Sequence, residues 1–343
     1  MKAKKINSIF TYERVTKCIW YSILAIIIAS VSYLTLILLR HYFPKFHLFS
    51  ISNFGLFGDF VGGVIGTIVA VIAALYIIKT YKKQIEQGNK QSFEKAFMLM
   101  LELHRQNVHE IEITINSNEK LSGKRVFKNL VDELRLLYED VYSTIEQLVP
   151  TDDRYQKWSD VSERKKLAHE LSYGYFFYDI DSYFLIIDKN DILYDLCEAV
   201  RSNIKNEHPL KSDILYLQRH AILGHYYRHL FNMVNWVDSS KAIKTEEKQK
   251  YCKLIRSQLS DYEEILLYYN TLSFLGKEWN EPLGKTDTKE MNLICKYRLL
   301  KNCPYYLYYF GIRPMETYVI EDEAWRKKGE LFFETDIRLH AKE

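Results

Sequence analysis

Arg219 and His225 are the two side chains in this sequence whose types and spacing best suit catalysis. A histidine can act as a general acid or base near neutral pH, and an arginine can stabilise the charge of a phosphodiester during cleavage. A similar spacing separates Arg164 from His169, so the pattern equally fits histidines that pack or hydrogen-bond on helix faces. We therefore assign no catalytic residue and keep phosphodiester cleavage by Arg219 and His225 as the alternative.

Other catalytic and metal-binding patterns are absent from the sequence. It contains no Ser-His-Asp arrangement, no HExxH, no GxSxG and no Walker-type loop. The cysteines are scattered, without a CxxC pair or a histidine at ligand spacing, which indicates neither a zinc site nor a disulfide framework. We therefore expect no metal, no cofactor and no enzymatic activity. The five cysteines are Cys18, Cys197, Cys252, Cys295 and Cys303.

A second group of polar residues stands among apolar residues in the C-terminal half of the sequence. Buried polar groups that lack hydrogen bonds destabilise a fold by about 1 to 3 kcal/mol each. Side chains of this kind are therefore expected either to bond to one another between packed helices or to form a ligand or partner site. The group consists of Arg228, Arg256, Gln258, Ser260, Glu263 and Asn270.

Long helices are expected to position these residues. Apolar residues recur at three- and four-residue steps, and glycine and proline are sparse, at 13 and 6 residues. One predicted helix runs from Ser162 to Asp188, and another starts at Thr245 and is closed by Gly276. The fold class that we predict is all-α. Further helical segments are predicted over 79–111, 127–148, 191–205, 213–237 and 287–302.

Two uncharged apolar runs, Ile19–Leu39 and Phe60–Ile78, precede this helical body. At about 1.5 Å per residue, a helix of either length matches the ~30 Å hydrocarbon core of a bilayer. Basic residues are more frequent outside the two runs than between them, which predicts an inner-membrane protein with both termini in the cytoplasm. The predicted domains are a basic N-terminus (1–18), a two-span transmembrane hairpin (19–78) with a short outer loop (40–57), and a helical cytoplasmic domain (79–343) with a membrane-proximal stalk (79–111).

Small residues occupy every fourth position along the second run. Such a ribbon lets two helices approach closely inside a membrane, where no hydrophobic effect drives them together. The partner is either the first run of the same chain or a second copy, which would make a homo-oligomer. Asp59 stands at the outer edge of the same run and is either a solvated carboxylate or part of a pore or gate. The ribbon consists of Gly58, Gly62, Gly66, Ala70 and Ala74.

Charge is distributed unevenly along the chain. The whole sequence carries +3, whereas residues 1–79 hold eight lysines or arginines against Glu13 and Asp59, a net charge of +6. Residues 80–343 therefore carry −3. Basic residues beside a span attract anionic lipid at about 1 kcal/mol each, so the predicted partner of this end is membrane lipid. The mildly acidic body argues against broad nucleic-acid binding, which needs a basic face.

Several segments occur in a characteristic order and spacing: Gly55–Gly63 running into Tyr81 and Gln84, Tyr226–Phe231, Ile255–Glu263, Leu267–Asn270 and Gly276. Together they resemble phage abortive-infection proteins of the AbiC type. The resemblance implies a bacterial defence protein with two membrane spans and a helical cytoplasmic domain, which interrupts phage multiplication in an infected cell. It implies no reaction, and it does not extend beyond Lys301. The resemblance also makes the polar group Arg228, Arg256, Gln258, Ser260, Glu263 and Asn270 residues of the family's motifs.

We therefore expect a membrane-anchored antiphage protein whose cytoplasmic domain senses or binds a phage-induced signal and acts at the inner membrane. Two alternatives stay open. One is a membrane-tethered ribonuclease that resembles helical HEPN enzymes and uses Arg219 and His225. The other is a binding module that sequesters an unidentified phage component.

Overall fold

The structure is predominantly helical, in agreement with the predicted all-α class. The chain divides into two compact units, Met1–Gln84 and Ile85–Glu343, and each is considered separately. The computed structural model describes residues 51–116, 119–185, 187, 192–207, 219–280, 292–303, 309–329 and 332–333, with scattered positions between 21 and 36.

Helix α2 (Ile51–Glu110) begins in the first unit, where it carries an exposed apolar surface. Most of its large apolar side chains between Val64 and Tyr81 are exposed, with Ile65 and Ile72 half-buried. An 18-residue stretch of the helix reaches a mean hydropathy of 2.1 with none of it buried. Among the helices that the structure describes, only α2 is long and apolar enough to cross a membrane. The predicted first span, 19–39, falls largely outside the described residues.

Helix α2 also begins earlier than the sequence predicts. Its first residue, Ile51, lies inside the stretch 40–57 that we assigned to an outer loop. The rest of that stretch, 40–50, lies outside the described residues.

A short hairpin follows α2 in the second unit. Strands β1 (Glu112–Asn116) and β2 (Glu119–Ser122) pair antiparallel, with Ile113 opposite Leu121. The sequence analysis predicts no strand here, because a run of five residues is too short for its alternation to stand out from the helical pattern around it. Gly123 then adopts a positive φ of 62°, a conformation that favours glycine, and the next helix begins.

Two helices with a break between them replace the single helix predicted over 162–188. Helix α3 (Lys124–Leu148) and the 3-10 turns η1 (Val149–Thr151) and η2 (Asp153–Trp158) lead into α4 (Val161–Tyr178) and α5 (Ile180–Phe184). At the break, Asp179 has a φ of 74°, and its carboxylate accepts hydrogen bonds from Ser182 N and Ser182 Oγ, each at 2.7 Å. The prediction was wrong here because this cap competes with continuation of the helix.

The helix predicted from Thr245 to Gly276 is also divided. Four residues separate helix α9 (Thr245–Arg256) from α10 (Asp261–Leu272), and the last of them, Ser260, caps α10. The other described helices of this unit are α6 (Ile192–Glu207), α8 (His220–Ser239), η3 (Phe274–Gly276), α11 (Lys277–Asn280), α12 (Leu293–Tyr297), α14 (Pro314–Thr317) and α15 (Val319–Arg326).

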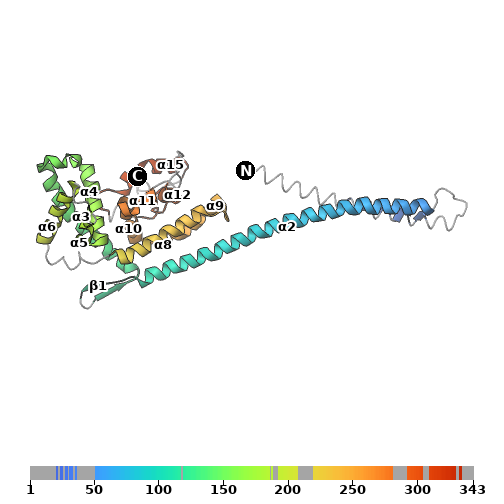
Figure 1. Ribbon diagram of the computed structural model, residues 1–343, viewed down its shortest axis with the longest axis horizontal. Coiled ribbons are helices and arrows are strands. Elements are labelled where there is room, and N and C mark those ends of the chain that lie inside the picture. Colours follow the sequence, from blue (N-terminus) through green and yellow to red (C-terminus); the bar gives the residue numbers. More distant parts are fainter. Residues whose placement is uncertain are drawn as a thin grey trace, which may run out of the picture. The chain divides into compact units, whose positions relative to one another are not determined.

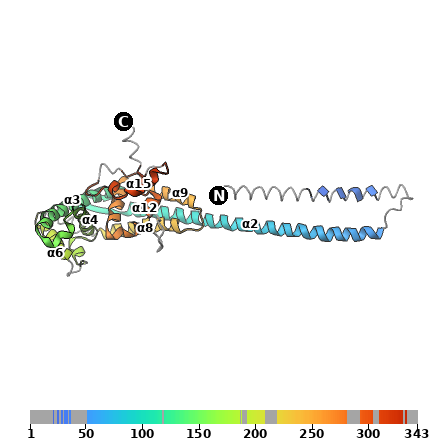
Figure 2. The same ribbon diagram turned by 90° about the horizontal axis from the view of Figure 1, so that it is seen from above.

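The part of α2 that belongs to the second unit lies against α8 and α9 (Figures 1 and 2). Phe93 stacks on Trp236 of α8 with ring centroids 4.4 Å apart, and Phe93 and Phe97 both meet the ring of Tyr251 on α9 at about right angles. These aromatic contacts join one face of α2 to the hydrophobic core. The same core buries the apolar face of α3, including Phe127.

Candidate functional site

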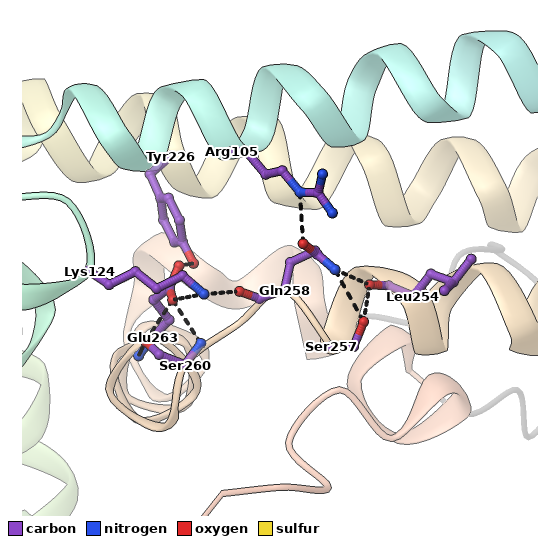
Figure 3. A network of polar contacts seen from close by, with 8 residues as sticks. All are labelled: Arg105, Lys124, Tyr226, Leu254, Ser257, Gln258, Ser260 and Glu263. Atoms are coloured by element: carbon purple, nitrogen blue, oxygen red, sulfur yellow. Dashed lines mark hydrogen bonds and ion pairs between the residues drawn. The ribbon is translucent and has the colours of Figure 1, made fainter.

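Glu263, in the first turn of α10, is the centre of a buried polar cluster (Figure 3). Its side chain is 0% exposed. Oε2 accepts hydrogen bonds from Ser260 N at 2.7 Å and Ser260 Oγ at 2.6 Å, and Oε1 accepts one from the hydroxyl of Tyr226 on α8 at 3.1 Å. The reciprocal contact between Ser260 and Glu263 is a capping box, so the residues that start α10 also hold it to α8.

Gln258 extends this cluster to α2 and to the start of α3. Its side-chain Oε1 accepts a hydrogen bond from Arg105 Nε at 2.9 Å, and its carbonyl accepts one from Lys124 Nζ at 2.6 Å. The same Nζ lies 3.9 Å from Glu263 Oε2 and places a positive charge beside the buried carboxylate. We call Arg105, Lys124, Tyr226, Gln258, Ser260 and Glu263 the Glu263 cluster; it connects α2, α3, α8 and α10.

The ring of Tyr226 also contacts a buried histidine on α2. His104 is 1% exposed, and its ring centroid lies 5.4 Å from that of Tyr226 and 5.9 Å from that of His229. His229 Nε2 donates a hydrogen bond to the carbonyl of Met100 at 3.0 Å. In the described part of the chain, neither ring nitrogen of His104 has a hydrogen-bond partner. Burial, with His229 and Lys124 nearby, lowers the pKa of His104 to about 4.

The other three polar residues of the predicted group lie outside the Glu263 cluster. Buried Arg256 donates from Nη1 to the carbonyl of Arg298 at 2.9 Å. Buried Asn270 donates from Nδ2 to the hydroxyl of Tyr173 on α4 at 3.1 Å. Arg228 is exposed and donates from Nε to the carbonyl of Gly224 in its own helix. The structure thus brings together Gln258, Ser260 and Glu263 and separates Arg228, Arg256 and Asn270 from them.

Arg219 and His225 have different surroundings. Arg219 is buried just before α8, and its Nη2 donates to both carboxylate oxygens of Glu133 on α3 at 2.7 and 2.8 Å. Burial raises the pKa of Glu133, and the neighbouring guanidinium opposes that rise. His225 lies on the exposed face of α8. The guanidinium that phosphodiester cleavage would require is therefore already paired with a carboxylate.

The small-residue ribbon on α2 is exposed at Gly58, Gly62, Gly66, Ala70 and Ala74, as is Asp59. A Cβ added to any of the three glycines would have no described atom within 4 Å apart from the adjoining residues and the nearby backbone of its own helix.

Two buried titratable residues near the Glu263 cluster escaped the sequence analysis. One is His104, and the other is Glu264, whose pKa burial raises well above its ordinary value, while Arg256 opposes the rise. A single titratable residue within an apolar stripe cannot be recognised from sequence as part of a site, because its neighbours in space are not yet known. The described ranges contain no group of three or more His, Cys, Asp or Glu side chains that could hold a metal ion.

Comparison with known proteins supports the family resemblance for part of the chain. Residues 218–306 match the model of a family described as "Putative phage abortive infection protein". The match includes α8 to α12 and therefore Tyr226, Gln258, Ser260 and Glu263. It extends beyond Gly276 and does not include Gly55–Gly63. No curated protein and no solved structure matches the chain.

Proposed function

We propose that this protein is a membrane-anchored bacterial phage-defence protein that acts by abortive infection. The observation that carries the proposal is the match of residues 218–306 to a phage abortive infection family. Helices of this segment pack against α2, the helix that also bears the exposed apolar stretch. In this proposal the helical body senses or binds a phage-induced signal, and α2 carries the response to the inner membrane. Both chain termini lie in the cytoplasm.

The proposal is tested by infecting bacteria that express the full chain and recording plaque formation together with a potential-sensitive dye. We expect fewer plaques and a loss of membrane potential after infection. Plaque formation equal to that of cells without the protein would contradict the defence function. A block of phage growth at unchanged membrane potential would contradict action on the membrane.

We further propose that the chain self-associates through the ribbon Gly58, Gly62, Gly66, Ala70 and Ala74. Exposed small residues at four-residue spacing are suited to close helix contact in lipid. Replacing both Gly62 and Gly66 with leucine should reduce chemical crosslinking between chains in membranes, because the larger side chains keep the helices apart. Unchanged crosslinking would contradict the role of the ribbon.

The protein is proposed to act without a catalytic step of its own. His225→Ala tests the alternative of a tethered ribonuclease, because that mechanism needs His225 as its acid or base. We expect protection against phage to be unchanged at equal protein level, and its loss would favour the ribonuclease. Sequestration of a phage component is tested by purification from infected cells, where a single viral protein at stoichiometric yield would favour it.

A further inference from the structure

The second-unit part of α2, Ile85–Glu110, packs against α8 and α9 in a defined register. It runs antiparallel to α8, because Phe93 meets Trp236 while His104, further along α2, meets the earlier residue Tyr226. It runs parallel to α9, because Lys90 pairs with Glu247 while the later residue Glu94 accepts a hydrogen bond from Tyr251. We call Ile85–Glu110 the α2 strap.

The polar contacts of the α2 strap with α9 are partly exposed to solvent. Lys90 Nζ forms an ion pair with Glu247, and both side chains are partly exposed. Tyr251 OH donates to Glu94 Oε1 at 3.1 Å, and Arg105 Nε donates to Gln258 Oε1 at 2.9 Å. Water can replace each of these contacts at small cost, because exposed ion pairs contribute only about 0 to 1 kcal/mol. They set the register of the strap and can be broken one by one.

The buried side chain of His104 makes the attachment of the α2 strap less favourable in free energy. It is buried against Tyr226 and His229, and neither of its ring nitrogens has a hydrogen-bond partner in the described residues. A buried polar group without a partner destabilises the state that buries it by about 1 to 3 kcal/mol, and release into water removes that cost. Unsatisfied groups of this kind in a folded protein call for an explanation.

We propose that the α2 strap is a releasable element: the aromatic contacts and the Lys90–Glu247 pair hold it against α8 and α9, and the unsatisfied His104 narrows the free-energy difference between the attached and the released state. A ligand that favours the released state then needs correspondingly less binding energy to shift the population. Its role as the step that transmits the phage signal rests on the proposed function, whereas its existence does not.

The first test removes the unsatisfied group. His104→Leu replaces the imidazole with an apolar side chain of similar size, which should stabilise the attached state. In hydrogen–deuterium exchange on the detergent-solubilised full chain, we expect the amides of residues 93–108 to exchange at least fivefold more slowly than in the parent. His109→Leu is the matched control, because His109 is exposed on the same helix and should leave those rates unchanged. Equal or faster exchange in His104→Leu would overturn the proposal.

The second test loosens the edge contact. Lys90→Glu places a third carboxylate beside Glu94 and Glu247, and we expect exchange over residues 93–108 to become at least fivefold faster. The double variant Lys90→Glu with Glu247→Lys restores an opposite-charge pair and should return the rates close to those of the parent. Lys95→Glu, an exposed position on the same helix, controls for the change in charge. Failure of the double variant to restore slow exchange would overturn the role of this pair.

Assays in bacteria test the signalling role of the α2 strap separately from its existence. If release transmits the signal, Lys90→Glu should slow growth without phage, and His104→Leu should reduce protection while the protein is folded and abundant. Exchange rates that change as expected without these cellular effects would contradict the signalling role and leave the strap intact. Unchanged exchange rates would overturn the strap whatever the cells do.

Discussion

The two ends of helix α2 carry apolar side chains into different surroundings. Between Val64 and Tyr81 most of the large apolar residues are exposed and none is buried, whereas Phe93, Phe97 and Leu101 are buried on one face. A helix that is apolar all round is typical of a membrane span, and a helix with one apolar face is typical of packing on a soluble core. One continuous helix thus combines the surface expected in lipid with the surface expected in water.

In the proposed function, this difference lets α2 connect a membrane to the helical body. The buried face of α2 meets α8 and α9, which belong to the segment that matches the phage abortive infection family. The exposed apolar end of α2 has no such partner among the described residues. The two ends should therefore respond differently to the same kinds of substitution.

The largest expected effect on the free energy of unfolding comes from a substitution in the buried end of α2. Phe97→Ala should lower the free energy of unfolding of the second unit by about 3 to 5 kcal/mol, because it removes a ring that is 1% exposed and leaves a cavity. Leu99→Ala, at a position 62% exposed on the same helix, should change it by no more than about 0.5 kcal/mol. Denaturant unfolding in detergent measures both. Equal losses would show that this part of α2 is not embedded in the core.

A charged side chain in the exposed apolar end of α2 tests whether this end lies in lipid. Val69→Arg places a cation near the middle of the apolar stretch, where insertion into a bilayer costs about 2.5 to 3.5 kcal/mol. The fraction of protein recovered with membranes should fall, whereas Val69→Leu should leave it unchanged. Membrane recovery that is the same for arginine and leucine would contradict the assignment of this stretch to lipid.

The Glu263 cluster should contribute less than the core but more than a surface pair. Glu263→Gln removes a carboxylate that accepts three hydrogen bonds and puts an amide group beside the same donors. We expect a loss of about 1.5 to 3 kcal/mol in unfolding free energy, the range for hydrogen bonds to charged groups. Glu246→Gln, at an exposed position on α9, is the matched control and should have little effect. Comparable losses would show that the cluster does not hold the helices together.

The smallest effect that we expect is a dependence on pH from the buried end. Burial lowers the pKa of His104 to about 4 and that of His169 to about 3. The unfolded chain therefore takes up protons that the folded chain does not, and stability should fall as the pH drops from about 7 towards 5. His104→Leu should reduce this loss by about 2 kcal/mol between pH 7 and pH 5. An equal loss in parent and variant, measured by denaturant unfolding, would contradict a neutral buried His104.

The sequence predicts the helices well where one apolar face persists, as it does along α3 from Val126 to Ile145. It fails at Asp179 and at Ser260, where a side chain caps a new helix inside an apolar pattern that continues across the break. The Ser260-to-Glu263 spacing is itself a capping-box signal, so the sequence does contain an indication of the second break. The hairpin β1–β2 is too short to be distinguished by periodicity.

The candidate site was only partly available from the sequence. Gln258, Ser260 and Glu263 stand out in the sequence as polar motif residues among apolar ones, but Lys124 and Arg105, which bond to Gln258, come from distant parts of the chain. The partner of Arg219 is Glu133, which is 86 residues away. Short spacing rules cannot identify such a pair, and this is why Arg219 resembled a catalytic residue.

The measurement that most directly tests the account is fractionation of bacteria that express the full chain, followed by carbonate extraction of the membranes at high pH. An integral protein stays with the lipid after this treatment, so we predict that the chain remains in the membrane pellet and is released only by detergent. Recovery of the intact, unaggregated chain in the supernatant would contradict a membrane role for α2 and the defence mechanism proposed from it.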